Sequence, residues 1–390
     1  MSNVLEKSSE LTRNEHEKRM LAYGREGVRR ADAIGNRGPV RFDDKGRLHP
    51  DILAAYWRHG YYVFEGVISA TEVEELRRDA ANMLDRAPAS PGATVDAKGR
   101  PAFGADAARE TYTIIRPLSD PQGGTAMFSG RHPSKMAEPA PDADAPEYVV
   151  LRMRAMCRYM PAGLRVYGHP DLLAIAASIN GDDFVPFNDV IFVKQPRVGG
   201  SIAWHQDGVT HWDSPQWDEG IHGFNYQVQI YPTTPGNALW VVPGTHKQGR
   251  VDIKRMVEEN GGSEQLPGAL PLVCAPGDVT IVNRQTLHGS FANSSPDIRI
   301  SITFGFHRRK SVLGAKAALS MASQNVSYDA ARVDRRAAVI AVAIDARRQH
   351  YPHEKPFVYQ PFAGRENEYR FNEVTFEKII RDYNNYDLAI

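Results

Sequence analysis

The sequence has very few cysteines, no long hydrophobic run and no excess of charge of either sign. Only Cys157 and Cys274 occur among 390 residues, which excludes a disulfide framework and suits a reducing compartment. The 47 basic residues equal the 47 acidic ones, and general binding of nucleic acid or anionic membranes needs a basic surplus. The longest apolar run, residues 337–344, is far shorter than the roughly 20 residues of a membrane span. Because the N-terminal residues are polar and lack an apolar signal core, we expect a cytoplasmic protein.

What remains is the composition of a globular chain, with 42% apolar and 24% charged residues. We predict a polar arm at residues 1–47, a single domain at residues 48–310 and a helical extension at residues 311–390 that packs on this domain. Within the domain, residues 86–147 are rich in proline, glycine, alanine and aspartate. A loop region of this length is typical of a lid or a substrate-binding loop.

The periodicity predicts helices before residue 180 and mainly strands after it. Apolar residues at helical spacing precede Gly60, follow the sequence Ser69-Ala70-Thr71-Glu72 and follow His169. Short strands separated by turn residues are expected at 61–67, 111–118, 190–194, 202–205, 223–231, 238–242, 278–283, 286–290 and 299–306. The pattern predicts a mainly β fold with flanking helices, whose core is a double-stranded β-helix, also called a jelly roll or cupin-like fold.

A metal site is indicated by His205-Gln206-Asp207, which follows a predicted strand. Alternate side chains of a strand share a face, so His205 and Asp207 point the same way and could occupy adjacent positions on one metal ion. The pattern alone is also compatible with a solvated turn and a hydrogen-bonded histidine.

A second histidine and an arginine support this interpretation. His288 ends a strand-rich stretch, and a turn centred between Asn293 and Ser294 would place Arg299 directly opposite it in a hairpin. His288, Arg299 and Ser301 would then share one face. A metal ligand, a guanidinium and a hydroxyl facing one cavity suit a dicarboxylate that chelates the metal at one end and pairs with arginine at the other. Taken alone, without the histidine, Arg299 is more typical of a structural ion pair.

These residues resemble the phytanoyl-CoA dioxygenase family of non-haem iron, 2-oxoglutarate-dependent oxygenases. The resemblance also includes residues 56–63 with the helix that follows, residues 237–247, and Gly277-Asp278 through Asn293-Ser294-Ser295, all in the family's order. It extends over roughly residues 50–309. The segment before Asn237 departs from the family pattern, which affects the expected substrate pocket and leaves the metal ligands intact.

The resemblance implies that His205, Asp207 and His288 bind Fe(II), and that 2-oxoglutarate and O₂ take the remaining positions on the iron. Two histidines and one carboxylate without a nearby thiol are the ligand set of non-haem Fe(II) oxygenases. Zinc would accept the same ligands. Arg299 and Ser301 are expected to bind 2-oxoglutarate, and Tyr226 lies where the family often has a tryptophan near this cosubstrate. Halogenating relatives lack the carboxylate, so Asp207 favours hydroxylation or a related oxidation.

Further polar and aromatic residues are candidates for the cosubstrate and substrate pockets. Lys194 and Asn188 lie on the strand before the metal motif, where Lys194 is expected to meet 2-oxoglutarate and Asn188 the substrate. Gln227 and Gln229 form a polar strand face, and His211 and Trp212 follow the metal motif on a loop. Solvent exposure or ordinary packing would produce the same patterns. No separate general acid or base is assigned.

We therefore expect an iron- and 2-oxoglutarate-dependent dioxygenase that hydroxylates a small or mid-sized metabolite or natural-product intermediate, releasing succinate and CO₂. The expected binding partner of this enzyme is a small-molecule substrate, and we expect it to bind neither nucleic acid nor a membrane. The chain is expected to be a monomer or homodimer. Two alternatives are open: a catalytically silent family member that binds or senses a ligand, and a zinc hydrolase that uses the same ligands.

Overall fold

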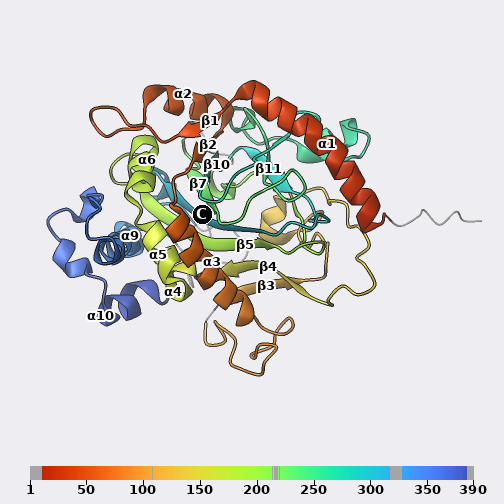
Figure 1. Ribbon diagram of the computed structural model, residues 1–390. Helices are drawn as coiled ribbons and strands as arrows, with labels where there is room; N and C mark the ends of the chain where they lie inside the picture. Colours follow the sequence, from red (N-terminus) through yellow and green to blue (C-terminus); the bar gives the residue numbers. More distant parts are fainter. Residues whose placement is uncertain are drawn as a thin grey trace, which may run out of the picture.

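Two β-sheets form the centre of the molecule, and helices cover the outer face of the larger sheet (Figure 1). The computed structural model describes residues 11–383 apart from residues 108, 213, 215–217, 219 and 317–326. The larger sheet has eight strands in the order β1 (Arg37–Pro39), β2 (Tyr61–Glu65), β10 (Val279–Asn283), β7 (Phe224–Gln229), β12 (Arg299–His307), β5 (Val185–Lys194), β4 (Val149–Arg154) and β3 (Tyr112–Ile115). The smaller sheet has the order β6 (Ile202–His205), β11 (Leu287–Ser290), β8 (Trp240–Val242) and β9 (Leu270–Pro271).

The predicted jelly-roll core with flanking helices is confirmed, and in the described part of the chain the two sheets do not close into a barrel. The helices are α1 (Arg13–Ile34), α2 (Pro50–His59), α3 (Ala70–Asp85), α4 (Met156–Tyr159), α5 (Pro161–Tyr167), α6 (Pro170–Asn180), α7 (Ile253–Glu259), α8 (Arg309–Val312), α9 (Ala330–His350) and α10 (Glu373–Thr375). Short helical turns are η1 (Met127–Gly130), η2 (Val209–His211), η3 (Thr245–Lys247), η4 (Gln360–Phe362), η5 (Glu366–Tyr369) and η6 (Phe376–Ile380).

The helices around the larger sheet begin and end at the residues that the sequence marks. Helix α2 has Pro50 at its first position and ends at Gly60, whose φ is 79°. A Cβ at Gly60 would lie 2.3 Å from Thr286 Oγ1, so only glycine fits between this helix and the smaller sheet. Helix α3 follows Ser69, whose hydroxyl accepts from the Glu72 N–H.

The central strands of the larger sheet divide their side chains between two environments. On β12, Ile300, Ile302 and Phe304 belong to the main hydrophobic core under the helices. Arg299 and Thr303 point to the opposite face and line a cavity between the two sheets. Strands β5 and β7 alternate in the same way. The sheet therefore has an apolar outer face and a polar inner face.

The predicted hairpin between His288 and Arg299 is wrong. Strand β11 pairs with β6 and β8 in the smaller sheet, whereas β12 pairs with β5 and β7 in the larger one. Arg299 lies opposite Lys194, and His288 lies opposite His205. The turn at residues 293–297 is a crossover between sheets, because Asn293 forms an isolated bridge with Gly199 instead of closing a hairpin.

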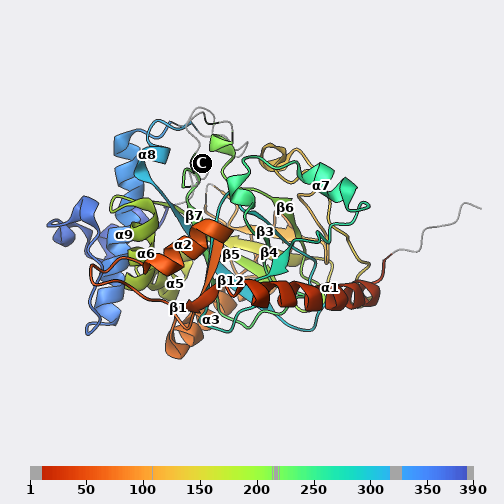
Figure 2. The ribbon, with the colours of Figure 1, turned by 90° about the horizontal axis from the view of Figure 1, so that it is seen from above.

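The two terminal segments lie on opposite sides of the core (Figure 2). Helix α1 packs on the smaller sheet, where the ring of Tyr23 stacks on Trp240 at 4.4 Å between centroids. Helix α9 lies at the other end, and Arg347 pairs there with Glu72 of α3 at 2.7 Å and with Glu354. The arm and the extension are thus both attached to the core, while the proposed division into domains stays a prediction.

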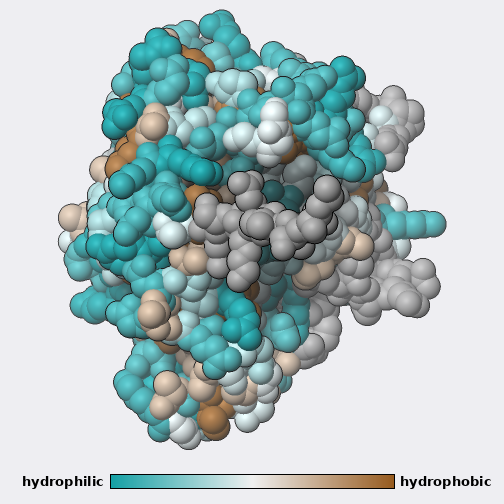
Figure 3. Space-filling model, turned by 90° about the vertical axis from the view of Figure 1, so that its right-hand side faces the viewer, coloured by the Kyte–Doolittle hydropathy of each residue, from teal (hydrophilic) through white to brown (hydrophobic). Residues whose placement is uncertain are grey.

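Among the described helices, none combines the length and the apolar character that a bilayer crossing requires. Figure 3 shows a face that is mostly hydrophilic, with hydrophobic residues in small and separate patches. The exposed large hydrophobic residues come from distant parts of the chain: Leu21, Val95, Met127, Leu313, Val358 and Val374. Single exposed residues of this kind are ordinary on a protein surface.

Candidate iron and cosubstrate site

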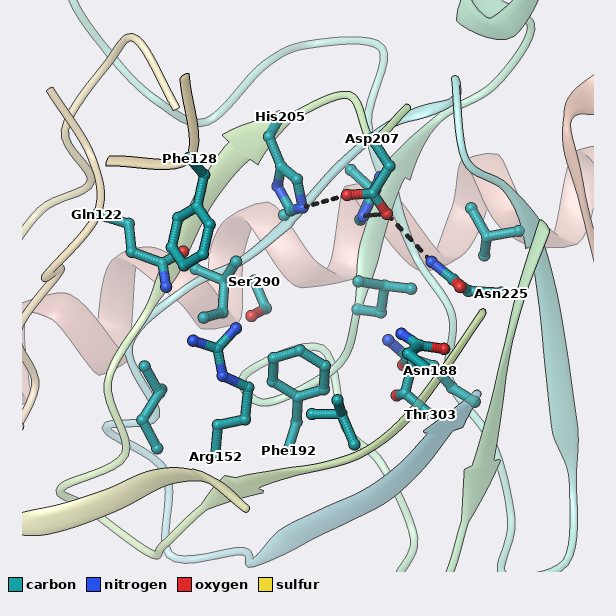
Figure 4. A pocket seen from close by; sticks show the side chains of 18 of the residues that line it. Gln122, Phe128, Arg152, Asn188, Phe192, His205, Asp207, Asn225, Ser290 and Thr303 are labelled. Atoms are coloured by element: carbon teal, nitrogen blue, oxygen red, sulfur yellow. Dashed lines mark hydrogen bonds and ion pairs between the residues drawn. The ribbon is translucent and has the colours of Figure 1, made fainter. Parts of the chain in front are cut away.

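The three residues that the sequence proposes as metal ligands lie together at one end of the cavity (Figure 4). His205 ends β6 and His288 lies directly opposite on β11, with their ring centroids 4.1 Å apart. His205 Nε2 is 3.8 Å from Asp207 Oδ1, and His288 Nε2 is 3.9 Å from Asp207 Oδ2. One ligand atom from each residue lies within 4.8 Å of the others. The two nitrogens and the carboxylate thus face a common point.

Each histidine is held so that its Nε2 faces this point. His205 Nδ1 is 2.8 Å from the Ala203 carbonyl oxygen, and His288 Nδ1 is 2.8 Å from the Thr286 carbonyl oxygen. A carbonyl only accepts, so each Nδ1 carries the proton and each Nε2 presents a lone pair. Such bonds fix the tautomer and ring orientation of metal-binding histidines. The donor set, two imidazoles and one carboxylate, fits a non-haem Fe(II) ion.

The Asp207 carboxylate is surrounded by cationic and amide groups. Arg131 Nη1 donates to Oδ1, Asn225 Nδ2 donates to Oδ2 at 3.1 Å, and Arg284 Nε lies 3.9 Å from Oδ2. Burial by itself raises the pKa of Asp207, but the charges of Arg131 and Arg284 outweigh it and lower this pKa below its ordinary value. The residue is therefore an anion, as a metal ligand must be.

A tight turn directs the chain away from the cavity after Asp207. Gly208 has a φ of +78°, and a Cβ there would lie 2.0 Å from His222 Nδ1. The backbone carbonyl of Asp207 accepts a hydrogen bond of 3.0 Å from the indole N–H of Trp212. A larger residue than glycine at position 208 would displace the carboxylate.

Arg299 provides a buried cation on the facing sheet. Its Nη2 donates to Gln227 Oε1 at 2.6 Å and to Ser301 Oγ at 3.1 Å, while its Nε has no partner. Burial lowers the pKa of Arg299 to about 10, and its hydrogen-bond partners among the described residues are uncharged. A buried guanidinium without a counter-ion fits one carboxylate of 2-oxoglutarate. Two sheets, and not the predicted hairpin, bring Arg299 and His288 to the same cavity.

Two further sequence candidates lie on the cavity wall. Lys194, the strand partner of Arg299, lines the cavity, and its ammonium group donates to the Gly200 and Phe291 carbonyls, both at 2.6 Å. Asn188 also lines the cavity, and its Oδ1 is buried without a hydrogen-bond partner. Their assigned roles stay predictions.

Tyr226 does not lie at the cosubstrate position. It belongs to the main hydrophobic core, and its hydroxyl donates to the Leu172 carbonyl of α6 at 2.9 Å. The alternation on β7 explains this correction, because Asn225 and Gln227 point into the cavity and Tyr226 between them points to the helices.

Three other pocket candidates also lie outside the cavity lining. Gln229 lies two residues beyond Gln227 on β7, opposite Ser301. His211 packs against the ring of His222, with centroids 5.8 Å apart. Trp212 supports the Asp207 turn and lies under the guanidinium of Arg250 at 4.4 Å. Neither His211 nor Trp212 lines the cavity in the described part of the chain, and their contact with substrate stays a prediction.

Several residues near the triad carry no signal in the sequence. Phe128 and Arg131 come from the long loop region, where Phe128 and Ser129 have φ values of 52° and 59°, a conformation that side chains rarely adopt. The His132 ring lies 4.4 Å from that of His205. Figure 4 shows Phe128 beside His205 over the cavity. Residues of the segment 86–147 thus line the cavity, no periodicity identifies which ones, and the role of the segment as a lid or substrate-binding loop stays a prediction.

Comparison with known proteins gives one family and several distant relatives. The family model described as phytanoyl-CoA dioxygenase (PhyH) matches residues 56–301. Phytanoyl-CoA dioxygenase 1 of Oryza sativa subsp. japonica is 28% identical over 116 residues, which cover 28% of this chain and 40% of that protein. Phytanoyl-CoA dioxygenase domain-containing protein 1 of Danio rerio is 24% identical over 266 residues, or 63% of this chain and 85% of that protein. The match thus spans less than half of the rice relative.

Two solved structures overlap with the fold. EctD from S. alaskensis with 2-oxoglutarate and 5-hydroxyectoine has a TM-score of 0.46 and 21% identity, covering 70% of this chain and 81% of that one. The non-heme alpha ketoglutarate dependent carbocyclase SnoK from nogalamycin biosynthesis has a TM-score of 0.46 and 14% identity, covering 81% of this chain and 94% of that one.

Proposed function

Because the chain belongs to the phytanoyl-CoA dioxygenase (PhyH) family, we propose that it is an Fe(II)- and 2-oxoglutarate-dependent dioxygenase that hydroxylates a small or mid-sized metabolite. One observation carries the proposal. His205, Asp207 and His288 face a common point in a cavity whose opposite wall holds Arg299 without a counter-ion. A metal ligand set and a free cation are what a chelating dicarboxylate requires.

In this function the two histidines and Asp207 hold the iron. The Ala203 and Thr286 carbonyls keep both imidazoles in the tautomer that offers Nε2. Asn225 and Arg284 orient the Asp207 carboxylate from the side of the larger sheet and the turn before β11. Arg131 also donates to this carboxylate from the loop region, so it neutralises part of the negative charge of the ligand set.

Arg299 binds the carboxylate of 2-oxoglutarate that is remote from the metal. Gln227 and Ser301 accept from its Nη2 and fix the plane of the guanidinium. A fixed planar fork pairs with a carboxylate in a defined orientation. Lys194 adds positive charge beside it from the neighbouring strand. The distance between the metal ligands on the smaller sheet and Arg299 on the larger sheet thereby selects the length of the dicarboxylate that can bind.

Bound iron and 2-oxoglutarate supply the oxidising chemistry. The balanced reaction converts substrate C–H, 2-oxoglutarate and O₂ to substrate C–OH, succinate and CO₂. One oxygen atom of O₂ enters the hydroxyl group and the other enters succinate. The protein residues bind and orient the reactants, and Phe128 and Phe192 form apolar walls of the cavity that limit access of water.

The proposal is tested by measuring succinate formation from 2-oxoglutarate with Fe(II) and O₂, across a panel of candidate metabolites. Substrate should stimulate succinate formation. Asp207→Ala and Arg299→Ala should each lower the rate at least about a hundredfold, since each removes a charged contact worth ~3 kcal/mol or more in a buried site. Asp44→Ala and Arg78→Ala are matched controls at exposed positions and should retain wild-type rates.

Anaerobic titration with Fe(II) and 2-oxoglutarate separates the alternatives. The proposed enzyme should develop the visible absorption of an iron chelate. Its absence would favour a silent binding protein, and preferential retention of zinc with no 2-oxoglutarate binding would favour a hydrolase. Equal succinate formation by wild type and Asp207→Ala would contradict the proposal.

A further inference from the structure

The cavity between the sheets is strongly cationic. Its described lining includes the seven cations Arg109, Arg131, Arg152, Arg154, Lys194, Arg284 and Arg299, whereas Asp207 is the single carboxylate in this part of the lining. The cavity volume is about 130 Å³. Burying such a charge imbalance is unfavourable unless an anion compensates it.

Four of these cations already have a contact or a role in the proposed iron and 2-oxoglutarate site. Arg131 and Arg284 lie against the Asp207 carboxylate. Arg299 faces the proposed 2-oxoglutarate position, and Lys194 donates to two backbone carbonyls. The remaining three, Arg109, Arg152 and Arg154, are not used by the iron or by the cosubstrate.

These three arginines have no counter-ion among the described residues. Arg154 Nη1 donates to the Glu110 carbonyl at 2.9 Å, and Arg152 Nη2 lies 3.4 Å from Thr113 Oγ1. Both acceptors are uncharged. The Nε atoms of Arg109 and Arg152 are buried without a partner. The charge of Asp189 acts on Arg109 and the charge of Glu110 acts on Arg154, whereas only burial and other arginines affect the pKa of Arg152. Arg152 is therefore the least compensated of the three charges, and Arg109 and Arg154 are compensated only in part.

The three guanidiniums act on one region of the cavity. Arg152 and Arg154 alternate with the core residue Met153 on β4, so they share the inner face. Figure 4 shows the Arg152 guanidinium pointing into the cavity below Phe128 and beside Phe192. Burial, and then the charges of Arg154, Arg131 and Arg109, lower the pKa of Arg152 well below its ordinary value. Arginine keeps its proton in proteins, so the region has a strong positive potential.

We propose that Arg109, Arg152 and Arg154 form an anion subsite, and that the substrate is a small metabolite with two or more negative charges on carboxylate or phosphate groups. This inference rests on the proposed function and names the substrate class of the same cavity. The planar guanidinium fork pairs with the planar carboxylate and with phosphate oxygens. The anionic end would contact β4, while another part of the molecule faces His205 and Asp207 across the cavity.

The first test measures anion binding with inorganic phosphate and with tricarballylate as probes. Thermal unfolding of the full, metal-free chain is recorded against chloride at matched ionic strength. At least one probe should raise the Tm of the wild type, and Arg152→Gln should weaken its binding about tenfold or more. Arg78→Gln removes the same charge at an exposed position and should bind like the wild type.

The Tm in chloride alone verifies that the variants fold. Because Arg152 has no counter-ion, we expect Arg152→Gln to unfold at the same temperature as the wild type or higher. Arg152→Lys keeps the positive charge but lacks the planar guanidinium group. It should therefore bind the anionic probe with an affinity between those of the wild type and Arg152→Gln. No stabilisation by either probe, or equal stabilisation of wild type and Arg152→Gln, would overturn the inference.

The second test is a substrate screen that separates the two anion types. Succinate formation is measured with dicarboxylates, phosphate monoesters and the neutral amides of the same carbon skeletons. The stimulating compound should be anionic, and its stimulation should be lost in Arg152→Gln. A neutral compound that stimulates wild type and Arg152→Gln equally would overturn the inference. Absence of the anaerobic iron chelate in the wild type would instead overturn the proposed function, so the two failures are distinguishable.

Discussion

At the scale of single residues, the site depends on side chains that hold other side chains. His205 and His288 each bind the carbonyl of the residue two positions earlier, at Ala203 and Thr286. This shared local geometry orients both rings from their own strands. Arg299 is oriented differently, by Gln227 on β7 and by Ser301 on its own strand. Its position therefore depends on the pairing of two strands.

We predict that Gln227→Leu weakens the binding of 2-oxoglutarate. The change removes the 2.6 Å acceptor of Arg299 Nη2 and leaves a guanidinium whose plane is no longer fixed. A hydrogen bond to a charged group contributes ~1.5–3 kcal/mol, so the KM for 2-oxoglutarate should rise about tenfold or more, with a smaller change in kcat. Anaerobic titration of the iron chelate should give the same loss in affinity.

Gln229→Leu is the matched control for this prediction, because Gln229 lies on the same strand and face, is not a hydrogen-bond partner of Arg299 among the described residues and does not line the cavity. It should keep the wild-type KM. Equal KM values for the wild type and Gln227→Leu would show that Ser301 and the Asn237 carbonyl orient Arg299 without Gln227.

At the scale of elements, helix α1 contains two residues of low helix propensity because they allow it to pack closely on the smaller sheet. Glycine in a helix interior costs about 1 kcal/mol relative to alanine, yet Gly24 and Gly27 both lie in the middle of α1. They face the smaller sheet, three residues apart. A Cβ at Gly27 would lie 2.7 Å from Trp240 and from Pro271, and one at Gly24 would lie 2.6 Å from Pro235. The helix approaches the sheet closely because these positions have no side chain.

We predict that Gly27→Ala destabilises the protein although alanine favours helices. The added methyl group would push α1 away from Trp240 and disturb the stacking of Tyr23 on this indole ring. Overpacking of this kind costs ~1–3 kcal/mol, which chemical denaturation would detect as a lower midpoint. Arg25→Ala on the exposed face of the same helix should change stability by less than about 0.5 kcal/mol. A stabilised Gly27→Ala would show that α1 does not pack in this way.

The strands near the metal ligands could be predicted from the sequence, whereas the strands with which they pair could not. Alternation and turn residues are local signals, so β6, β11 and β12 lie close to the predicted ranges. The pairing of β11 with β6 places His288 opposite His205, although 83 positions separate these histidines in the sequence. A hairpin was the local alternative, and it failed because the chain crosses to the other sheet after Asn293. Local patterns contain no information about that crossover.

The cationic wall of the cavity was missed for a related reason. Arg152 and Arg154 lie on β4, a strand that the sequence does not indicate because polar and loop-forming residues precede it. Arg109 and Arg131 lie in irregular segments. Neutral net charge at the level of the whole chain conceals this local surplus. Charge balance therefore constrains the outer surface of this protein and says nothing about its cavity.

At the scale of the whole molecule, buried neutral histidines make the fold sensitive to acid. Burial is the first cause of a lowered pKa for nine described histidines: His16, His59, His132, His169, His205, His211, His222, His288 and His307. In the unfolded chain each pKa returns to about 6.5. Below this pH the unfolded chain binds more protons than the folded one, so the free energy of unfolding falls as pH falls. Above it these groups make no pH-dependent contribution.

His169 allows this effect to be measured at one site. It caps α6, where its Nδ1 accepts from the Asp171 N–H, and burial followed by the charge of Arg347 lowers its pKa to about 3. Between pH 7.5 and 5.0 this single histidine should reduce the free energy of unfolding by about 2 kcal/mol. His169→Asn keeps a side-chain acceptor at the cap and removes the titrating group.

We therefore predict that the metal-free His169→Asn protein loses about 2 kcal/mol less stability than the wild type between pH 7.5 and 5.0, measured by urea unfolding at each pH. The comparison uses the change with pH, so a constant effect of the substitution on cap strength cancels. Ser69→Asn exchanges the cap of α3 without involving a histidine, and it should keep the wild-type pH dependence. If His169→Asn and the wild type lose equal stability, His169 binds its proton at the same pH in both states, and the acid sensitivity must come from the other buried histidines.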